Sequence, residues 1–375
     1  MRKLIAGALG ALAIIAMSCA PASADAFDVS PSYSFTPSSS GQGDVPFSLA
    51  VDQNGDLWEG TISGRLRHLV LDDQGDVDSV SECIVFDAAD EYARALFGFD
   101  FDSNGNAYVA TGPGGVGVVP ARELSRCQNG AHVLMTSSVS SPFPSDAKLH
   151  GDYLYVAANT NGVVEVYKVS PSLALYAFVR LDVVSPSGIA IGDENFAVTE
   201  SHGFGGMTQI AFADVEGHGD VNTPPTLTPT PVTTVAGTSP PTNGLGGEDY
   251  VAYGCLGTLV VTGNSNGDFY PVVQFAPEAS GAGAAYLAAL AGPMSTLQRP
   301  EGIVFDRAGR MWLADPVAGS ITRFDNALSC VAYDKRTVEL ANTGLDAGAS
   351  GWAAGLAVLA IVLGLGLAGR KRHSS

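Results

Sequence analysis

Six stretches of the chain repeat one order of apolar and polar residues. Each has a short apolar strand, a turn rich in Asp, Asn and Gly, a second apolar strand, a Gly-rich turn and a third strand. The stretches begin at Pro46, Leu96, Pro144, Pro186, Glu248 and Pro300, so their starts lie 50, 48, 42, 62 and 52 residues apart. Periods of ~40–50 residues with several strands per unit are typical of propeller blades. The pattern predicts an all-β, six-bladed β-propeller over residues 46–335.

The local chemistry agrees with this fold. Asn-Gly pairs at 54–55 and 104–105 supply the positive φ that tight hairpin turns require. The segments 302–305 and 311–314 are almost continuously apolar, as strands between two neighbouring sheets must be. One blade buries little alone, so a closed ring is needed to cover both faces of every sheet. Outer fourth strands are expected at 81–86 in the first blade and at 131–135 in the second.

Two segments depart from the repeat. Residues 222–244, NTPPTLTPTPVTTVAGTSPPTNG, combine prolines that block ladder hydrogen bonds with threonines that stay hydrated. They predict a flexible insertion between blades; an ordinary mobile loop is favoured over one carrying O-linked sugars. The Ala/Gly-rich segment 279–298 is expected to hold a short helix.

The chain ends in an apolar run and a basic tail. Residues 351–369 carry no charge and, at about 1.5 Å per residue, match the ~30 Å hydrocarbon core of a bilayer. The tail 370–375 begins Arg-Lys-Arg-His, and such clusters stay on the cytoplasmic side. A transmembrane helix is therefore predicted over 351–369. The alternative, a buried core helix, fits a uniformly apolar terminal run less well.

The first 24 residues have the three regions of a secretory signal peptide. Arg2 and Lys3 precede an apolar stretch, and Ala22-Ser23-Ala24 provides the small-residue cleavage pattern. We expect signal peptidase to cut after Ala24. Lipid attachment at Cys19 is the alternative, but the residues before it lack the large aliphatic side chain of a lipobox. Either route exports the chain.

Charge limits the partners of the exported part. Residues 25–343 hold 14 of the 19 Lys and Arg and 37 of the 38 Asp and Glu, which gives a formal charge near −23. Such a charge favours solubility and argues against binding to nucleic acid or anionic lipid. Acidic surfaces also hold divalent cations, but charge alone defines no site.

Four cysteines remain after export, and an even number in an oxidising compartment favours disulfides. Three pairings are open, and spacing suggests Cys83 with Cys127 and Cys255 with Cys330. The spacings of a zinc site, Cys-x-x-Cys or His-x-x-x-His, are missing from the sequence.

The pentapeptide Leu340-Ala341-Asn342-Thr343-Gly344 stands before the apolar run, in the segment 336–350. With the span and the basic tail, it resembles a cell-wall sorting signal of Gram-positive bacteria, in the form associated with actinobacterial sortases. The resemblance implies cleavage between Thr343 and Gly344 and transfer of the Thr343 carboxyl to a peptidoglycan precursor amine. Ala341 replaces the commoner proline and leaves the sortase class open. The alternative is an uncleaved single-pass membrane anchor.

The repeats also resemble a known family. The Pro-x-Gly start, the Asp before the turn and the Trp-containing second strand at 300–315 are similar to those of NHL-repeat and gluconolactonase-like six-bladed propellers. The resemblance covers roughly residues 46–326. It implies that the innermost strands begin, and the second strands end, at one mouth of a central channel where ligands bind.

Aligning the repeats under this resemblance gives a set of candidate mouth residues. Their oxygen and nitrogen atoms suit Ca²⁺ or another divalent cation, which would activate water for ester or lactone hydrolysis. The set is Asn159, Glu200, His202, Asp249, Asn264, Glu301 and Asp315. Gluconolactonase-like enzymes grip their metal with Glu, Asn and Asp from separate blades, whereas this chain has an acidic residue at only two of six inner-strand starts. That departure counts against a lactonase. Residues 52–56, DQNGD, look like a calcium loop but lack its distal Glu, and turn chemistry explains them better.

The sequence therefore favours a secreted propeller, preceded by a short segment 25–45 and joined to the cell wall by its C-terminus. It would act as a surface binding or interaction module for an unidentified ligand, with no certain cofactor. The alternative is a lactonase or esterase that depends on a divalent cation.

Overall fold

The structure is a computed structural model, and it describes most of the repeat region. The described residues are 32–37, 44–86, 95–112, 115–127, 130–159, 162–181, 185–200, 207–235, 248–254, 258–263, 272–276, 285–289, 297 and 299–325. The predicted signal peptide, sorting signal, transmembrane helix and basic tail all lie outside them. No helix within the described ranges is long and apolar enough to cross a membrane.

The described strands form six sheets, numbered here in the order of their innermost strands. The first sheet has the order β2 (Pro46–Val51), β3 (Leu57–Thr61), β4 (Arg65–Leu71), β5 (Val77–Phe86) and β9 (Ala131–Leu134). The second has β6 (Leu96–Phe101), β7 (Ala107–Thr111), β8 (Gly115–Val119) and β10 (Ser137–Val139). The third has β11 (Pro144–His150), β12 (Tyr153–Ala158), β13 (Val163–Lys168), β14 (Ala174–Arg180) and β18 (Thr226–Leu227).

The other three sheets have four strands each. The fourth has β15 (Pro186–Ile191), β16 (Asn195–Glu200), β17 (Met207–Ala211) and β19 (Thr233–Val235). The fifth has β20 (Glu248–Tyr253), β21 (Leu259–Gly263), β22 (Val272–Ala276) and β23 (Ala285–Ala289). The sixth has β24 (Gly302–Phe305), β25 (Met311–Asp315), β26 (Ser320–Phe324) and β1 (Tyr33–Phe35).

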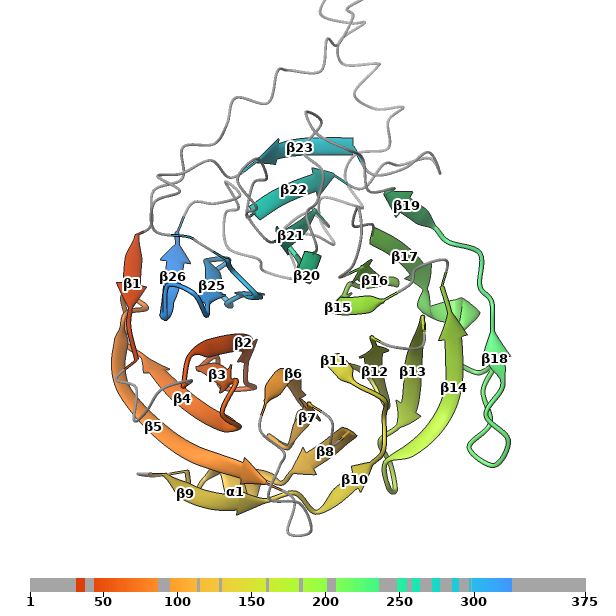
Figure 1. The fold of residues 1–375 in the computed structure, drawn as a ribbon, viewed down its shortest axis with the longest axis horizontal. Coiled ribbons are helices and arrows are strands. Elements are labelled where there is room, and N and C mark those ends of the chain that lie inside the picture. Colours follow the sequence, from red (N-terminus) through yellow and green to blue (C-terminus); the bar gives the residue numbers. More distant parts are fainter. Residues whose placement is uncertain are drawn as a thin grey trace, which may run out of the picture.

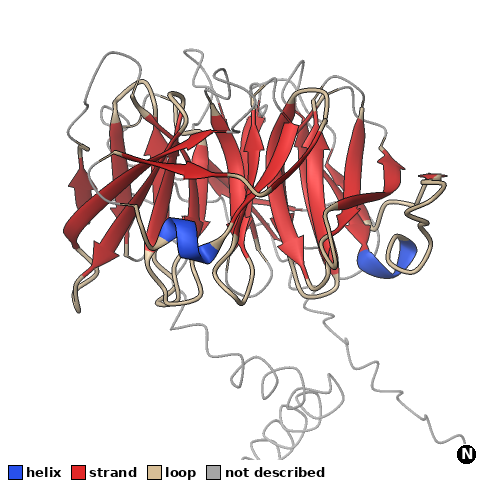
Figure 2. Cartoon of the chain, turned by 90° about the horizontal axis from the view of Figure 1, so that it is seen from below, coloured by secondary structure: helices blue, strands red, loops and turns tan. Residues whose placement is uncertain are grey.

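These sheets are arranged radially around a central axis (Figure 1). The innermost strands of consecutive sheets contact one another, and β24 returns to contact β2, so the circle is closed. The prediction of an all-β propeller is confirmed. Five innermost strands begin at the predicted starts, and the sixth begins at Gly302, two residues after Pro300. The face where innermost strands begin and second strands end is called the mouth face below. Two short helices, α1 (Ala121–Leu124) and η1 (Phe212–Asp214), lie well apart from each other on the lower face of the ring in Figure 2.

An aspartate organises the first hairpin of several sheets. Asp52 Oδ1 accepts hydrogen bonds from the backbone N–H groups of Asn54 and Asp56 at 2.8 and 3.1 Å, and its Oδ2 accepts one from Trp58 Nε1 at 3.1 Å. Asp306 bonds its turn and Trp312 Nε1 in the same way. The glycine predicted to permit the turn, Gly55, has a φ of 96°. One carboxylate thus fixes both the turn and the tryptophan of the second strand.

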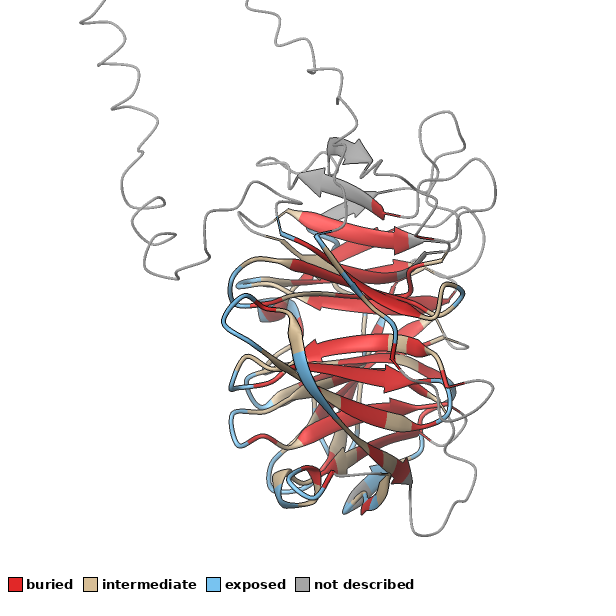
Figure 3. Cartoon of the chain, turned by 90° about the vertical axis from the view of Figure 1, so that its left-hand side faces the viewer, coloured by how far each residue is buried: buried red, intermediate tan, exposed pale blue. Residues whose placement is uncertain are grey.

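Apolar side chains fill the spaces between neighbouring sheets. Figure 3 shows that most of the described strand residues are buried. Trp58 of the first sheet packs with the fully buried Phe99 and Val109 of the second. Tyr155 of the third sheet meets Phe196 of the fourth, with ring centroids 4.7 Å apart. Because both faces of such sheets are covered, their second strands are buried along their whole length, as in Leu57–Thr61.

The N-terminal strand completes the last sheet and so closes the ring. β1 pairs antiparallel with β26, where Tyr33 lies opposite Arg323. The Arg323 guanidinium lies 5.3 Å from the Tyr33 ring centroid and 5.5 Å from that of Trp312. It also donates to Asp76 Oδ1 of the first sheet at 2.7 Å. Cation–π contacts and an ion pair therefore hold the two ends of the ring together.

The outer strands correct the sequence-based assignment. The segment 131–135 was expected in the second blade, but β9 pairs in parallel with β5 of the first sheet, and β10 is the outer strand of the second. The predicted disulfide between Cys83 and Cys127 is present and brings this segment back to β5. Closing a loop with a sequence separation of 44 stabilises the fold by roughly 4 kcal/mol in the chain-entropy model. Cys255 and Cys330 lie outside the described residues.

Both departures from the repeat contain strands. Within the Pro/Thr-rich segment, β18 adds to the edge of β14 and β19 is the fourth strand of its own sheet. The prediction of a flexible insertion is therefore wrong for residues 222–235, because backbone hydrogen bonds in this segment pair it with the outer edges of the third and fourth sheets. Residues 236–244 lie outside the described ranges. The helix expected within 279–298 is also wrong over Ala285–Ala289, which form strand β23.

Candidate functional site at the mouth of the channel

Three aromatic side chains meet where the channel would open on the mouth face. Phe47 and Phe97 lie at the starts of β2 and β6, with ring centroids 5.3 Å apart in an edge-to-face arrangement. Tyr250 of β20 lies 6.0 Å from Phe47 in the same kind of contact. These distances are those of favourable aromatic pairs. The three residues, called the aromatic plug below, come from the first, second and fifth sheets.

The Tyr250 side chain reaches from its own sheet to the opposite side of the ring. Its hydroxyl donates to the carbonyl oxygen of Phe97 and lies 3.2 Å from that of Ser145. The second sheet, which carries Phe97, is three positions around the ring from the fifth sheet. Tyr250 is 5% exposed. At the level of the plug, protein atoms therefore occupy the ring axis.

Hydroxyl groups fasten the neighbouring inner strands to one another. Ser48 Oγ donates to the carbonyl oxygen of Leu96 at 2.8 Å, and Thr262 Oγ1 to that of Glu301 at 3.1 Å. Ser145 Oγ lies 2.9 Å from the carbonyl oxygen of Ser187. Inner strands are sheet edges, and these side chains satisfy backbone acceptors that the sheets leave unpaired.

Glu301, a predicted cation ligand, is 2% exposed at the start of the sixth sheet. Its Oε1 lies 2.6 Å from Nε of Arg299, whose side chain is 42% exposed. An ion pair therefore already engages this carboxylate. A cation would have to compete with the arginine for it.

Asp315, the second acidic candidate, is fully buried at the end of β25. Its Oδ1 accepts hydrogen bonds from the N–H groups of Val317 and Ala318 at 3.0 and 2.9 Å. Its Oδ2 accepts one from Arg299 N at 3.0 Å. Asp315 thus fixes the turn after β25, which is a structural role for a residue predicted to bind a ligand.

The other predicted site residues lie around the same face or outside the described ranges. Asn159 follows β12 and Glu200 ends β16, and both are half-buried. Asp249 belongs to the backbone of β20. His202 and Asn264 fall outside the described residues. Asn159, Glu200, Glu301 and Asp315 therefore lie at strand ends on the mouth face, and the presence of a ligand or metal there stays a prediction.

A buried ion cluster lies beside the mouth, between β3, β4 and β5. It consists of Asp44, Glu59, Arg65, Arg67 and Glu82 and is called the Arg67 cluster below. Arg67 donates to Glu59 Oε1 at 2.7 Å, to Glu82 Oε2 at 2.9 Å and to Asp44. Burial raises the pKa of Glu59 to about 8, against the opposing attraction of Arg67. With Glu59 protonated, the two arginines balance Asp44 and Glu82.

Further along the inner strands, two carboxylates bridge neighbouring sheets. Asp146 Oδ2 accepts the N–H of Ile189 at 2.8 Å, and Asp100 Oδ2 accepts that of Leu149 at 2.9 Å. Burial raises the pKa of both carboxyls, and Lys148 opposes the shift. Lys148 Nζ lies 3.7 Å from Asp146 and donates to the Phe99 carbonyl at 3.2 Å. These groups pair with one another and with backbone, so they serve the contact between sheets.

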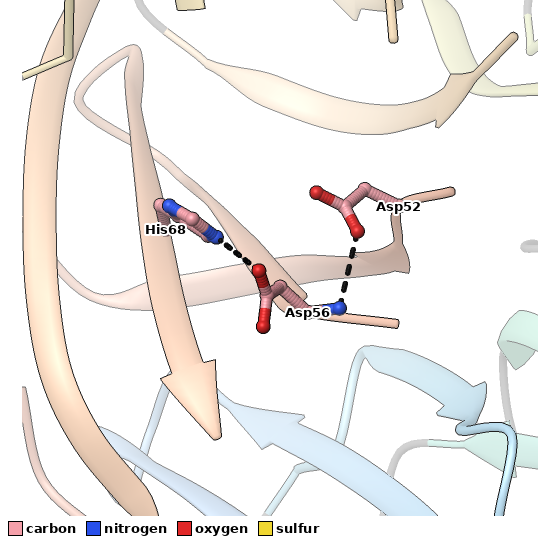
Figure 4. Close-up of side chains that lie close together, drawn as sticks. All are labelled: Asp52, Asp56 and His68. Carbon is pink, nitrogen blue, oxygen red and sulfur yellow. Dashed lines mark hydrogen bonds and ion pairs between the residues drawn. The ribbon is translucent and has the colours of Figure 1, made fainter. Parts of the chain in front are cut away.

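One group of side chains in the described part of the chain brings three candidate ligand atoms within 4.8 Å of one another. It consists of Asp52, Asp56 and His68 (Figure 4). His68 Nε2 lies 3.0 Å from Asp56 Oδ2, and the His68 ring stacks on Trp58 at 4.4 Å. Asp52 already accepts backbone and indole N–H bonds on both oxygens. Turn chemistry therefore accounts for residues 52–56, as the sequence suggested.

The comparisons with known proteins agree with the fold. No protein-family model and no curated protein matches the sequence. Among solved structures, the chain is similar to a PQQ-bound aldose sugar dehydrogenase from Streptomyces coelicolor, at 14% identity and a TM-score of 0.52, covering 78% of this chain and 99% of that one. It is also similar to a carbohydrate-active enzyme of family AA12 from Trichoderma reesei, at 13% identity and a TM-score of 0.51, covering 79% and 97%.

A third similar chain belongs to a mitotic checkpoint complex, at 10% identity and a TM-score of 0.51, covering 80% of this chain and 92% of that one. At identities this low, the structural similarity shows a shared propeller fold and nothing finer. That fold is consistent with the NHL and gluconolactonase-like resemblance. They do not assign an activity, because one fold serves many functions.

Proposed function

We propose that this chain is a six-bladed propeller displayed on the cell surface, where it acts as a binding or interaction module. The aromatic plug carries this proposal, because Tyr250 bonds across the ring axis to Phe97 at the place where gluconolactonase-like enzymes bind their substrate. Glu301 and Asp315, which would hold a metal there, are bonded to Arg299 and to backbone N–H groups. The rims and faces of the ring then provide the binding surface.

Attachment to the cell wall is the second part of the proposal. The last strand, β26, ends at Phe324, and residues 326–343 separate the described ring from the Thr343 carboxyl that a sortase would transfer. Signal peptidase, a sortase and a peptidoglycan precursor are the partners this route requires. The ring would sit close to the wall, since so few residues lie between them.

Changing Thr343 to Ala tests the attachment. We expect the variant to leave the wall fraction almost completely, because the sortase acts on the threonine carbonyl, and to appear in the membrane or the medium. Immunoblots of wall, membrane and medium fractions measure this. Changing Thr337 to Ala, outside the motif, is the matched control and should leave the distribution unchanged. If the Thr343 variant is still released only by wall-digesting enzymes, the attachment proposal is wrong.

The alternative function is hydrolysis of lactones or small esters with a divalent cation. The acidic and amide residues around the mouth favour it, and enzymes are among the similar structures. We expect the purified ectodomain to show no lactone turnover that a chelator abolishes, because the plug and the Arg299 bonds occupy the site. Metal analysis and a lactone panel with and without chelator measure this. Chelator-sensitive turnover that is lost in Glu301→Gln or Asp315→Asn would instead establish the hydrolase.

A further inference from the structure

Residues 220–232 form an extended strap along the outer edge of the third sheet. Asp220 N donates to the Tyr176 carbonyl at 3.0 Å, and Phe178 N donates to the Pro225 carbonyl at 2.9 Å. β18 then runs parallel to β14, with Thr226 opposite Phe178. Val232 N donates to the Gln209 carbonyl at 2.8 Å and returns the chain to the fourth sheet. The strap is thus held at both ends, on the rim and away from the mouth (Figure 1).

Exposure alternates along the middle of the strap. Thr226, Thr228 and Thr230 are exposed, whereas Leu227 and Pro229 between them are half-buried. Side chains of an extended chain point to opposite sides in turn. The three threonines therefore present their hydroxyl groups to solvent on one side, while the residues between them face the sheet.

Hydrogen bonding separates these threonines from their neighbour Thr223. Thr223 is also exposed, but its Oγ1 donates to Asp220 Oδ2 at 3.0 Å within a turn. In the described structure, the hydroxyls of the other three make no hydrogen bond to protein. Prolines at 229 and 231 lack an N–H and keep this stretch out of a regular ladder, so an enzyme can reach the hydroxyls in the folded protein.

We propose that Thr226, Thr228 and Thr230 are the acceptors of O-linked hexose on the rim of the propeller. The threonine Oγ attacks the anomeric carbon of a hexose activated as a phosphate ester, and a C–O glycosidic bond forms. The phosphate leaves with the electron pair of its bond to that carbon, and the hydroxyl proton passes to a base of the transferase. Threonine-rich segments with interspersed proline have the composition of O-glycosylated stalks, because they form no packed core of their own.

The sugars would coat the rim between the third and fourth sheets and leave the mouth face uncovered. They would also shield the strap from proteases, which attack exposed extended segments most readily. This modification does not depend on attachment at Thr343. Its presence can therefore be established whether or not the proposed function is correct.

Mass analysis of the full-length protein, recovered from the organism that makes it, tests the proposal. Cleavage after Glu216 and Glu248 releases the strap on one fragment. We expect that fragment to carry one to three whole hexose units, placed by fragmentation on Thr226, Thr228 and Thr230. Replacing all three with Val should remove every unit, whereas Thr223→Val should remove none. Val keeps the size and the β-branch, so the strand is preserved.

Three results would overturn the proposal. The first is a fragment that carries no modification. The second is sugar on Thr223, or sugar found only at positions other than Thr226, Thr228 and Thr230. The third is phosphate in place of hexose. Site mapping on the unaltered protein decides among them, even if the triple variant is not exported.

Discussion

Replacing Arg67 with Met is expected to lower the free energy of unfolding by about 3–5 kcal/mol. Arg67 is 1% exposed and pairs with Glu59, Glu82 and Asp44 at once. Burial alone would lower the pKa of Arg67, but these carboxylates outweigh that effect and raise it. Removing the guanidinium leaves the buried Asp44 carboxylate with Arg65 alone as counter-charge in the Arg67 cluster and the buried Glu59 Oε1 without its donor, and that is costlier than the loss of an exposed ion pair.

Urea unfolding of the oxidised ectodomain measures this effect. Arg122→Met is the matched control, because the Arg122 side chain is 77% exposed and lies 3.9 Å from Glu123, so it should change stability by less than ~1 kcal/mol. Arg67→Lys keeps the charge but not the planar fork, and should recover only part of the loss. A cost for Arg67→Met as small as that of Arg122→Met would show that the Arg67 cluster does not form.

Stability should fall as pH rises through the titration of Glu59, and Glu59→Gln should remove this dependence. Burial raises the Glu59 pKa from 4.5 to about 8, so the folded state binds more protons than the unfolded state between these values. The stabilising contribution of the neutral carboxyl is therefore complete below pH ~4.5 and lost by pH ~8, by on the order of 3–5 kcal/mol. Glu59 Oε2, buried without a hydrogen-bond partner, is the atom on which an ionised group would be least stable.

The measurement is the difference in unfolding free energy between Glu59→Gln and the unaltered ectodomain from pH 5 to pH 9. The difference isolates Glu59, because Asp100 and Asp146 titrate in both proteins. As pH rises, the unfolding free energy of Glu59→Gln should increase relative to that of the unaltered ectodomain by several kcal/mol. A difference that stays constant across this range would mean that Glu59 is ionised throughout and that the cluster carries a net negative charge.

The ring could be predicted from the sequence because its inner strands are specified locally. Apolar runs, an Asp six residues before a Trp or Tyr, and a Gly in the turn recur at Asp52, Asp102 and Asp306. Each set forms its hairpin through contacts within about seven residues, such as Asp306 with Trp312. The strand starts at Pro46 and Leu96, in two of these repeats, follow directly from this pattern.

The rim could not be predicted in the same way, because its strands pair over long distances. β9 pairs with β5 only after the chain has passed through β6, β7 and β8 of the second sheet and through α1. β1 joins β26 from the other end of the chain. Such short strands can pair with any sheet edge that lies nearby. Their own residues do not specify which edge that is. The same holds for β18 and β19 within the Pro/Thr-rich segment.

Tyr250, the plug residue that crosses the ring, was not predicted because the alignment compared the second residue of each repeat, where Phe47 and Phe97 lie, and not the third. At the third position the other five sheets have Ser48, Gly98, Asp146, Gly188 and Gly302. Tyr250 is the one bulky residue at this position, and the sequence alone shows that contrast. The carbonyl groups that its hydroxyl contacts across the ring could not be predicted, because they depend on which sheet lies opposite. Glu301 and Asp315 both lie on the mouth face, but their bonds to Arg299 and to backbone depend on turns that the sequence does not specify.

The most direct test of surface display by this propeller is the mass of its C-terminal peptide after wall digestion. Trypsin cleaves after Arg336, so an anchored protein should yield a peptide of residues 337–343 whose Thr343 carboxyl carries an amine-linked fragment of peptidoglycan. A C-terminal peptide that continues through Gly344 into the apolar run, from protein released without wall digestion, would contradict the account.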